Sequence, residues 1–238
     1  MDRNEIKELV AREAVEALVK SGMKLGLGTG STAVLALRYI GSLLSRGKLK
    51  DILAVPTSFQ ASMECEKLGI PFYTLNSKAI DGMLDLTIDG ADEVDGKNRL
   101  VKGGGGALLP EKVVAYSSAT YVIVVDQTKI VESLGLNFPV PVEVIPMARV
   151  PVTLSLQKLG AEVVLRDAQR KAGPVITDQG NLLLDIRFKE AVDPAALEAI
   201  INNIPGVVEN GFFTGPSDRL LRPVIFIGYG DGTVKRKD

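Results

Sequence analysis

The sequence predicts an α/β protein with a Rossmann-like, mainly parallel sheet that has helices on both faces, plus an inserted α+β (ferredoxin-like) second domain. Three observations indicate this fold. Short apolar runs alternate with amphipathic helical segments in the first half of the chain, a pattern typical of parallel sheets. The proline-rich segment Phe138–Pro146 then breaks the alternation, and the elements after it follow a helix-strand-strand-helix-strand order. With 238 residues, the chain can form both parts.

The elements of the first part are predicted from apolar spacing. Helices are placed where apolar residues recur every three to four positions, and strands where short apolar runs end at turn residues. The first helix is expected to be capped by Asn4 and to end at Gly22, with an apolar face of Ile6, Leu9, Val10, Ala17 and Leu18. The elements expected next are strand Lys24–Gly28, helix Ala33–Leu44, strand Ile52–Val55, helix Phe59–Leu68, strands Phe72–Leu75 and Leu84–Asp89, helix Pro110–Ser117 and strand Tyr121–Asp126.

The second part is predicted to be an insertion. Proline lacks the N–H of an interior strand, so Phe138–Pro146 is expected to be an edge strand or linker. The apolar tail Pro223–Val234 is expected to form a hairpin that rejoins the first sheet. We therefore assign residues 1–137 and 215–238 to the Rossmann-like catalytic domain and residues 138–214 to the inserted domain. Its expected elements are helix Ala148–Leu159, strand Ala161–Arg166, a hairpin of Val175–Thr177 with Leu182–Phe188, helix Pro194–Ile204 and strand Val207–Phe213.

The absence of histidine is the most informative feature of the composition. It excludes imidazole bases, histidine-dependent catalytic triads and histidine-ligated zinc, so acid–base chemistry must rest on Asp, Glu, Lys or Tyr. The single cysteine, Cys65, excludes an intrachain disulfide and a cysteine-cluster zinc site, and favours a reducing compartment. We expect Cys65 to be a structural thiol, and we expect neither a metal nor a cofactor.

The charge balance favours a small-molecule substrate. The formal net charge is -1, no basic patch favours nucleic acid, and no apolar stretch is long enough to span a membrane. The charged N-terminal segment is unlike a signal peptide. We therefore expect a cytoplasmic protein that binds neither nucleic acid nor a membrane.

The segment Gly26–Thr32 is rich in glycine and hydroxyl groups and lies between a predicted strand and a predicted helix. Backbone N–H groups and the positive end of a helix hold anions in such places, so this segment is a candidate phosphate cradle. It is not a dinucleotide motif, because Ser31 replaces the third glycine, nor a P-loop, because no lysine precedes the hydroxyl residue. The alternative is a tight turn in which threonine and serine cap the helix.

The segment Asp89–Asp95 is dense in carboxylates and follows an apolar strand. Crowded carboxylates tend to raise one another's pKa, which suits one of them to proton transfer. An EF-hand is excluded because Ala91, Val94 and Leu100 occupy positions that need a ligand, a glycine and a glutamate. The alternative is a solvated acidic loop built on an Asp-Gly turn.

Four consecutive glycines, Gly103–Gly106, follow Lys102 and precede a helix expected to begin at Pro110. Glycine loses the most backbone entropy on folding, so the run indicates a backbone that must come close to something. Glu111, early in that helix, is a candidate acid–base group, and its alternative role is to interact with the helix dipole. Lys129, just beyond a predicted strand, is either a surface lysine or a ligand-binding group.

These four segments are all expected at the carboxyl ends of strands, where open α/β sheets bind their ligands. Together they supply a phosphate cradle, paired carboxylates, two lysines and a glutamate. This set suits a phosphorylated polyol whose carbonyl chemistry is carried out by the glutamate.

Five motifs together resemble the type A ribose-5-phosphate isomerases. They occur in that family's order and spacing over nearly the whole chain, and the departures are peripheral: Gly106 extends the glycine run, residues 228–232 are richer in glycine, and the connection at 217–222 is longer. The motifs are Gly28–Thr32, Asp89–Glu93, Lys102–Gly105, Glu111–Lys112 and Val142–Ala148.

The resemblance implies a metal-free aldose–ketose isomerisation between D-ribose 5-phosphate and D-ribulose 5-phosphate, in the non-oxidative branch of the pentose phosphate pathway. It implies that Glu111 is the base of an enediolate mechanism, that Asp89 and Asp92 serve ring opening and proton movement between oxygens, and that Lys102 stands beside the developing charge. Lys7 on the first helix is implied near the phosphate, and a homo-oligomer, dimer or tetramer, is implied. The implied substrate-binding residues are Thr29, Gly30, Ser31, Thr32, Asp89, Gly90, Ala91, Asp92, Lys102, Gly103, Gly104, Gly105 and Lys129.

Two other functions remain open at this point. A CoA transferase of related architecture can also combine a glycine-rich loop with a nucleophilic glutamate, and it would form a covalent glutamyl intermediate. A non-catalytic sugar-phosphate sensor would bind the ligand without turnover, but such a module normally accompanies a DNA-binding domain, for which the region before Lys24 is too short.

Overall fold

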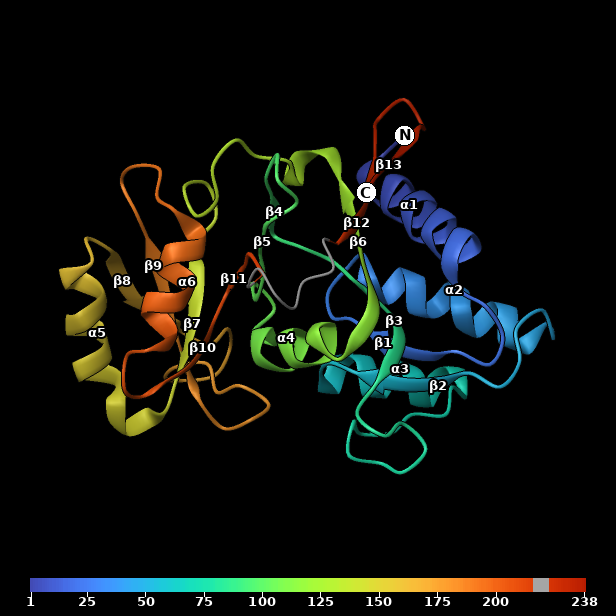
Figure 1. The fold of residues 1–238 in the computed structure, drawn as a ribbon, viewed down its shortest axis with the longest axis horizontal. Coiled ribbons are helices and arrows are strands. Elements are labelled where there is room, and N and C mark those ends of the chain that lie inside the picture. The colour runs from blue at the N-terminus through green and yellow to red at the C-terminus, as the bar shows by residue number, and fades with distance from the viewer. Residues whose placement is uncertain (216–222) are drawn as a thin grey trace. The chain divides into compact units, whose positions relative to one another are not determined.

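The computed structural model describes residues 1–215 and 223–238, which form two compact units. The first unit contains residues 1–91, 110–129 and 223–238, and the second contains residues 92–109 and 130–215. Each unit has its own sheet (Figure 1). Each also has its own apolar core.

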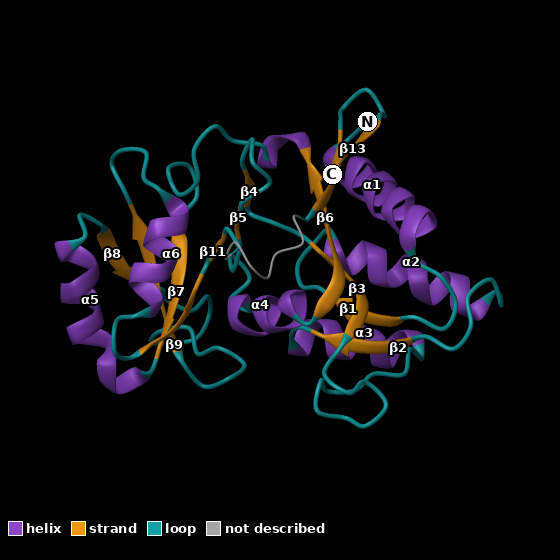
Figure 2. Cartoon of the chain, in the orientation of Figure 1, coloured by secondary structure: helices purple, strands orange, loops and turns teal. Residues whose placement is uncertain are grey.

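The first unit is built on a six-stranded, mainly parallel sheet (Figure 2). Its strands are β1 (Lys24–Leu27), β2 (Leu53–Pro56), β3 (Leu84–Asp89), β6 (Ser118–Asp126), β12 (Val224–Gly228) and β13 (Val234–Lys237). They lie in the order β13-β12-β6-β3-β1-β2, and every neighbouring pair is parallel except β12 with β13. The C-terminal tail therefore rejoins the first sheet, as predicted.

Helices cover both faces of this sheet, also as predicted. Leu86 and Ile88 of β3 share a core with apolar residues of the helices on one face. Thr87 and Asp89 alternate with them and point to the other face, where Val114 packs near Thr87. The helices on the first face are α1 (Arg3–Leu18), α2 (Ala33–Ser45) and α3 (Phe59–Leu68), and the helix on the second is α4 (Leu108–Tyr116), which contains Val114.

Helix α1 begins and ends earlier than predicted. Its N-cap is Asp2, whose side chain accepts hydrogen bonds from the N–H groups of Asn4 and Glu5, while the Glu5 carboxylate accepts one from the N–H of Asp2. This reciprocal capping box satisfies donors at both ends of the first turn, which an Asn4 cap could not do. The helix ends at Leu18 rather than Gly22, and Ala17, predicted to be on the apolar face, is exposed.

Cys65 lies on α3 and is fully buried in the apolar core of the first unit. Burial raises the pKa of its thiol to about 11, and the nearby Glu64 and Glu66 charges act in the same direction. A thiol in this state is a poor nucleophile, in agreement with the structural role predicted for it.

The second unit contains an antiparallel, four-stranded sheet in the order β10-β7-β9-β8. With its helices it follows the order β-α-β-β-α-β, one strand more than the predicted α+β pattern. The elements are β7 (Val140–Val144), the 3₁₀ turn η2 (Pro146–Ala148), α5 (Arg149–Lys158), β8 (Glu162–Leu165), β9 (Leu182–Arg187), α6 (Pro194–Asn202) and β10 (Val207–Asn210).

The prediction that Phe138–Pro146 is an edge strand or linker is wrong, because β7 lies between β9 and β10. Pro141 is tolerated there for a local reason. Its carbonyl accepts a hydrogen bond from Gly211, just beyond the last β10 pair of Asn210 with Val142. The N and C=O of a strand residue face the same side, so the missing donor points to the end of β10 and not to β9.

A small antiparallel sheet, β11-β5-β4, was not predicted. Its strands are two residues long, too short for a periodic pattern: β4 (Glu93–Val94), β5 (Leu100–Val101) and β11 (Phe212–Phe213). The predicted strand Val207–Phe213 is thus divided between two sheets at Gly211, where the backbone bonds to both Pro141 and Lys102.

Two other predicted strands are reduced to single bridges. Phe72 pairs only with Ala54, and Ile176 pairs only with Leu182. The longer connection expected at 217–222 lies outside the described residues.

Glu143 of β7 is a fully buried carboxyl group. Its Oε1 accepts hydrogen bonds from Thr177 Oγ1 at 2.8 Å and Asn181 Nδ2 at 2.9 Å, whereas its Oε2 makes none. Burial raises the pKa of Glu143 above its usual value, although these two hydrogen bonds act against the shift. The folded state therefore holds this proton to a higher pH than the unfolded chain does.

We predict that Glu143 makes the protein less stable as the pH rises. Below the ordinary glutamate pKa the carboxyl is protonated in both states, and above its folded pKa the full cost of burying the charge is present, about 1.4 kcal/mol per pKa unit. In urea unfolding between pH 4 and pH 8, the stability of Glu143→Gln relative to wild type should increase with pH. Exposed Glu190→Gln is the control and should show no such trend; a pH-independent difference for Glu143→Gln would contradict the prediction.

Candidate active site

The strand order of the first unit places four loops along one edge of its sheet. β2 lies on one side of β1 and β3 on the other, so the connections diverge at β1 and β3. Parallel sheets bind ligands at the carboxyl ends of strands beside such a switch point. The segments that lie there are 28–32 after β1, 57–58 after β2, 90–91 after β3 and the 3₁₀ turn 127–129 after β6.

The loop after β1 is hydrogen-bonded to the segment that follows β2. Gly30 has φ +99° and donates its N–H to Gln60 Oε1 at 2.9 Å. Thr29 Oγ1 lies 2.6 Å from Ser58 Oγ and 2.7 Å from Thr57 Oγ1. The Thr32 side chain makes no capping hydrogen bond to α2, so the capping alternative does not explain the hydroxyl groups. The sequence prediction missed Thr57, Ser58 and Gln60, although they follow a predicted strand.

Asp89 is fully buried at the end of β3. Its Oδ1 accepts hydrogen bonds from the N–H of Gly90 at 2.7 Å and of Thr29 at 3.2 Å. A Cβ at position 28 would lie 2.1 Å from Asp89 Oδ1 and 2.7 Å from Asp89 Cα. Gly28 is therefore required so that this carboxylate can lie across the end of β1.

A cluster of cationic groups surrounds the same edge of the sheet. Lys7 of α1 donates to Ser31 Oγ at 2.9 Å, and its burial together with the charges of Arg3 and Lys129 lowers the pKa of Lys7, against the attraction of Asp126. Three cations thus lie near the cradle segment with one carboxylate among them. Such a cluster is stabilised by a bound anion.

Asp126 organises the loop after β6. It accepts hydrogen bonds from the N–H and hydroxyl of Thr128 and from Arg3 Nε, the last at 3.1 Å. Burial opposes its ionisation, but these hydrogen bonds outweigh burial and hold the pKa of Asp126 below its usual value. Lys129 closes the 3₁₀ turn η1 (Gln127–Lys129) that follows.

Glu111 is buried in the first turn of α4, with 4% of its surface exposed. Val114, three residues later and hence on the same side of the helix, packs against the sheet face that also carries Asp89. Pro110 is the third helical residue, not the first as predicted, and it fits because the first N–H groups of a helix have no partner within it. Glu111 and Asp89 thus lie on the same face of the sheet.

Asp92, Lys102 and the glycine run belong to the second unit. The N–H of Gly104 donates to Asp92 Oδ2 at 2.7 Å. Lys102 is almost fully buried, with its ammonium 5.7 Å from the ring centroid of Phe213. The run follows β5 of the small antiparallel sheet, so the expectation that every candidate segment follows a strand of the parallel sheet is wrong for this one.

The glycines of the run are needed for two reasons. Gly103 has φ +98°, a conformation that other residues rarely adopt. A Cβ at Gly104 would lie 2.7 Å from Asp92 Oδ1 and 2.9 Å from the Phe138 ring. Gly104 and Gly105 are exposed, so their backbone can be approached closely.

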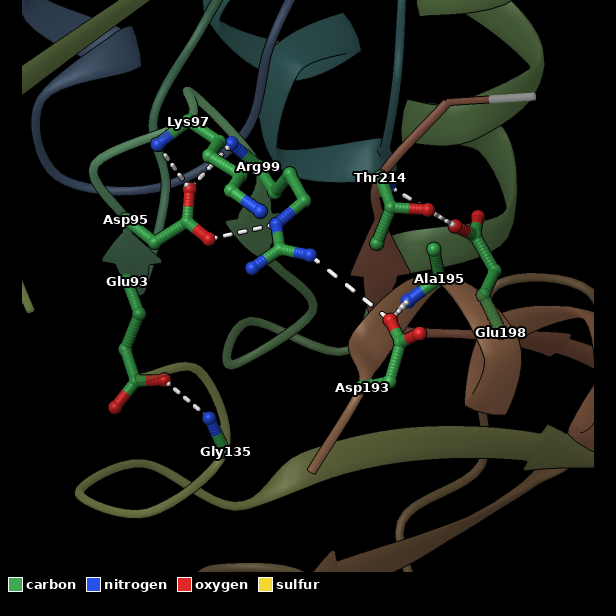
Figure 3. A network of polar contacts seen from close by, with 9 residues as sticks. All are labelled: Glu93, Asp95, Lys97, Arg99, Gly135, Asp193, Ala195, Glu198 and Thr214. Carbon is green, nitrogen blue, oxygen red and sulfur yellow. Dashed lines mark hydrogen bonds and ion pairs between the residues drawn. The ribbon is translucent and has the colours of Figure 1, made fainter. Parts of the chain in front are cut away.

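The remaining carboxylates of Asp89–Asp95 do not belong to one acidic cluster, contrary to the prediction. Figure 3 shows Glu93 bound to Gly135 and Asp95 bound to Arg99, and these bonds are 2.7 Å each. Glu93 also accepts the N–H of Phe138 at 2.8 Å. Both side chains therefore hold loops of the second unit in place, which leaves Asp89 and Asp92 as the candidates for chemistry.

A family model for ribose 5-phosphate isomerase A (phosphoriboisomerase A) matches residues 53–229. The chain belongs to this family. The ribose-5-phosphate isomerase A of Treponema denticola is 51% identical over 242 aligned positions, which cover 99% of each protein. That of Thermosynechococcus vestitus is 51% identical and covers 91% of this chain and 90% of its own.

Solved structures of the family have the same fold. A D-ribose-5-phosphate isomerase in complex with phospho-erythronic acid has a TM-score of 0.92 at 38% identity, with full coverage of both chains. The ribose 5-phosphate isomerase A of Methanocaldococcus jannaschii has a TM-score of 0.89 at 43% identity, covering 99% of this chain and 100% of its own. Ribose 5-phosphate isomerase A is thus the family in which the site must be interpreted.

Among residues 1–215 and 223–238, no three Asp, Glu or Cys side chains are grouped so that they could hold a metal ion. Within the same ranges, no helix is both long and apolar enough to cross a membrane.

We predict that Gly28→Ala destabilises the protein and displaces Asp89. The added methyl group meets both the carboxylate and the backbone of Asp89, and overpacking of this kind costs about 1–3 kcal/mol. Urea unfolding measures the loss. Gly96→Ala is the matched control, because no atom lies within 4 Å of a Cβ there. Wild-type stability of Gly28→Ala would contradict the steric explanation.

Proposed function

We propose that this chain interconverts D-ribose 5-phosphate and D-ribulose 5-phosphate, with Glu111 as the base that moves a proton between C2 and C1. Membership of the ribose 5-phosphate isomerase A family over nearly the whole chain is the observation that carries this proposal. The buried carboxylates at Asp89 and Glu111 on one face of the sheet support it. Neither a CoA transferase nor a sugar-phosphate sensor is favoured by this membership.

The phosphate group is proposed to bind at the loop after β1. Thr29–Thr32 lead into α2, whose first N–H groups have no side-chain cap and whose dipole favours an anion. Lys7 and Lys129 add positive charge, and Ser31 already accepts a hydrogen bond from Lys7. A phosphate dianion would relieve the repulsion among these cations.

The proton transfer is assigned to Glu111. Removal of the C2 proton sends the C–H electron pair into a C1=C2 double bond and the carbonyl pair onto O1, which gives an enediolate. Protonation of C1 by the Glu111 carboxylic acid, with transfer of a proton from O2 to O1, gives the ketose. A buried carboxylate at a helix start suits this task because the dipole favours the ionised form while exclusion of water keeps it reactive.

The oxygen atoms of the substrate are assigned to the other groups. Asp89 and Asp92 are proposed to serve ring opening and the movement of protons between O1 and O2, together with the backbone of Gly90 and Ala91. Lys102 and the backbone of Gly103–Gly105 are proposed to stabilise the enediolate charge. Removing one such donor in other enzymes typically lowers the rate by about 10²–10³.

The oligomeric state and compartment are also proposals. A homodimer or tetramer is supported by the apolar side chains of Phe59 and Met63, which lie one turn apart on α3 and are 66% and 56% exposed. A cytoplasmic location is supported by the single cysteine, a buried free thiol that suits a reducing compartment. A strictly monomeric protein by light scattering at micromolar concentration would contradict the oligomer.

We predict that Glu111→Gln retains the fold and the substrate affinity but loses turnover. Glutamine fills the same space and cannot accept the C2 proton, so kcat should fall by about 10²–10⁴. Steady-state kinetics with ribose 5-phosphate measures this, and phospho-erythronic acid should inhibit wild type competitively and bind the variant at least as tightly, since one negative charge beside the ligand is removed. Near-normal kcat would exclude Glu111 as the base.

We predict that Lys7→Met raises KM and leaves kcat within a few-fold of wild type. Loss of one charge-assisted hydrogen bond to phosphate costs about 1.5–3 kcal/mol, or roughly a 10- to 100-fold rise in KM where KM reports binding. Lys20→Met, an exposed lysine just beyond the end of the same helix, is the control and should leave both constants unchanged. An unchanged KM for Lys7→Met would show that the phosphate binds elsewhere.

A further inference from the structure

We propose that Arg166, held by Asp185, is a positioning residue that sets the direction of the Gly103–Gly104 peptide and thereby of Asp92. This inference rests on the proposed isomerase function for its catalytic consequence. The contacts that carry it all lie within the second unit.

Arg166 uses the donors of its guanidinium group in two directions. Nε and NH2 bind the two carboxylate oxygens of Asp185 at 2.8 Å and 2.5 Å, which is the bidentate geometry of a strong ion pair. NH1 donates to the carbonyl oxygens of Gly103 at 3.0 Å and Gly104 at 3.2 Å. The two side chains are 16% and 20% exposed, so the pair is only partly screened by water.

The Gly103–Gly104 peptide is thereby bonded at both ends. Its C=O accepts from Arg166, and its N–H donates to Asp92 Oδ2 at 2.7 Å. A peptide is planar, so fixing the carbonyl direction also fixes the N–H direction. The Gly103 carbonyl further accepts the N–H of Gly106 at 2.9 Å, which closes the turn.

The glycine run needs such a restraint. Glycine reaches positive and negative φ about equally well, so four in succession have many conformations in which the N–H of Gly104 does not reach Asp92. Asp185 lies in β9 and Arg166 directly follows β8, so a paired sheet supplies the fixed support. The sheet thus fixes the Arg166 guanidinium group, which in turn restrains the peptide that binds Asp92.

Lysine cannot replace Arg166 in this role. An ammonium is a point charge without the planar fork, and it cannot bind both oxygens of Asp185 and two consecutive carbonyls at the same time. A purely electrostatic role would survive Arg166→Lys, whereas a positioning role would not.

The test combines kinetics with NMR of the full-length protein. In Arg166→Lys and Arg166→Ala, kcat should fall by about 10- to 100-fold with KM changed less, as expected for a catalytic group that is present but misplaced. The Gly104 amide resonance, recorded without substrate, should shift and show increased fast motion. Guanidinium chloride at non-denaturing concentration should restore part of the kcat of Arg166→Ala, because a cavity of about 370 Å³ borders Arg166 and Gly104–Gly106.

Arg187 provides the matched control. It lies on β9 two residues from Asp185, is exposed, and also donates to a loop carbonyl, that of Asn137 at 3.2 Å. Arg187→Lys and Arg187→Ala should leave kcat and the Gly104 resonance unchanged. Should Arg166→Ala fail to fold, Asp185→Asn removes the support for the guanidinium group with a smaller change and should reproduce the loss of kcat.

The outcomes separate this inference from the proposed function. Wild-type kcat in Arg166→Lys, or an unmoved Gly104 resonance in both Arg166 variants, would overturn the positioning role while wild-type isomerase activity stands. Wild-type protein without isomerase activity would instead remove the proposed function and the catalytic consequence with it. The NMR measurement would still decide in that case whether Arg166 holds the peptide.

Discussion

The first unit depends on one steric constraint: a carboxylate must lie buried across the end of a neighbouring parallel strand. Asp89 of β3 occupies the space that a side chain at Gly28, directly after β1, would fill. Gly26, one pleat earlier, leaves room in the same way for Thr87 and Val114. The lack of a side chain at Gly26 and Gly28 therefore lets α4 pack closely and brings a buried glutamate to the face that carries Asp89. The same two glycines thus allow the packing of α4 and the placement of Asp89.

The second unit meets a related constraint by a different means. There the backbone itself must be exposed, so the chain uses successive glycines, and polar side chains supply the order that glycine lacks. Asp92 holds one end of the Gly103–Gly104 peptide and Arg166 the other. Glu93 and Asp95, which neighbour Asp92 in the sequence, are used instead to hold loops of the unit in place. Glu93 and Asp95 are thus structural groups because loop residues donate hydrogen bonds to them, whereas Asp92 remains a candidate for chemistry.

Sequence reasoning predicted the features that depend on local pattern. Alternating strands and helices predicted the parallel sheet, and the ends of the apolar runs predicted that the segments at Gly28, Asp89 and Lys129 lie at the carboxyl ends of its strands. It failed where the decisive partner is distant or the element is very short. Arg166 lies 62 residues from Gly104, so no spacing connects them. Pro141 was placed at an edge because its strand partners were unknown, and two-residue strands such as β5 carry no period to detect.

The central claim, an isomerisation in which a carboxylate moves a carbon-bound proton without a metal, is tested most directly by one measurement. Ribose 5-phosphate is incubated with the purified protein in D₂O containing EDTA, and proton NMR follows both ketose formation and deuterium entry at carbon. The account predicts ribulose 5-phosphate that carries deuterium at C1, because the proton that Glu111 takes from C2 exchanges with solvent on the carboxyl group before C1 is protonated. Folded protein that forms no ketose and exchanges no proton, or that needs a divalent ion to do either, would contradict it.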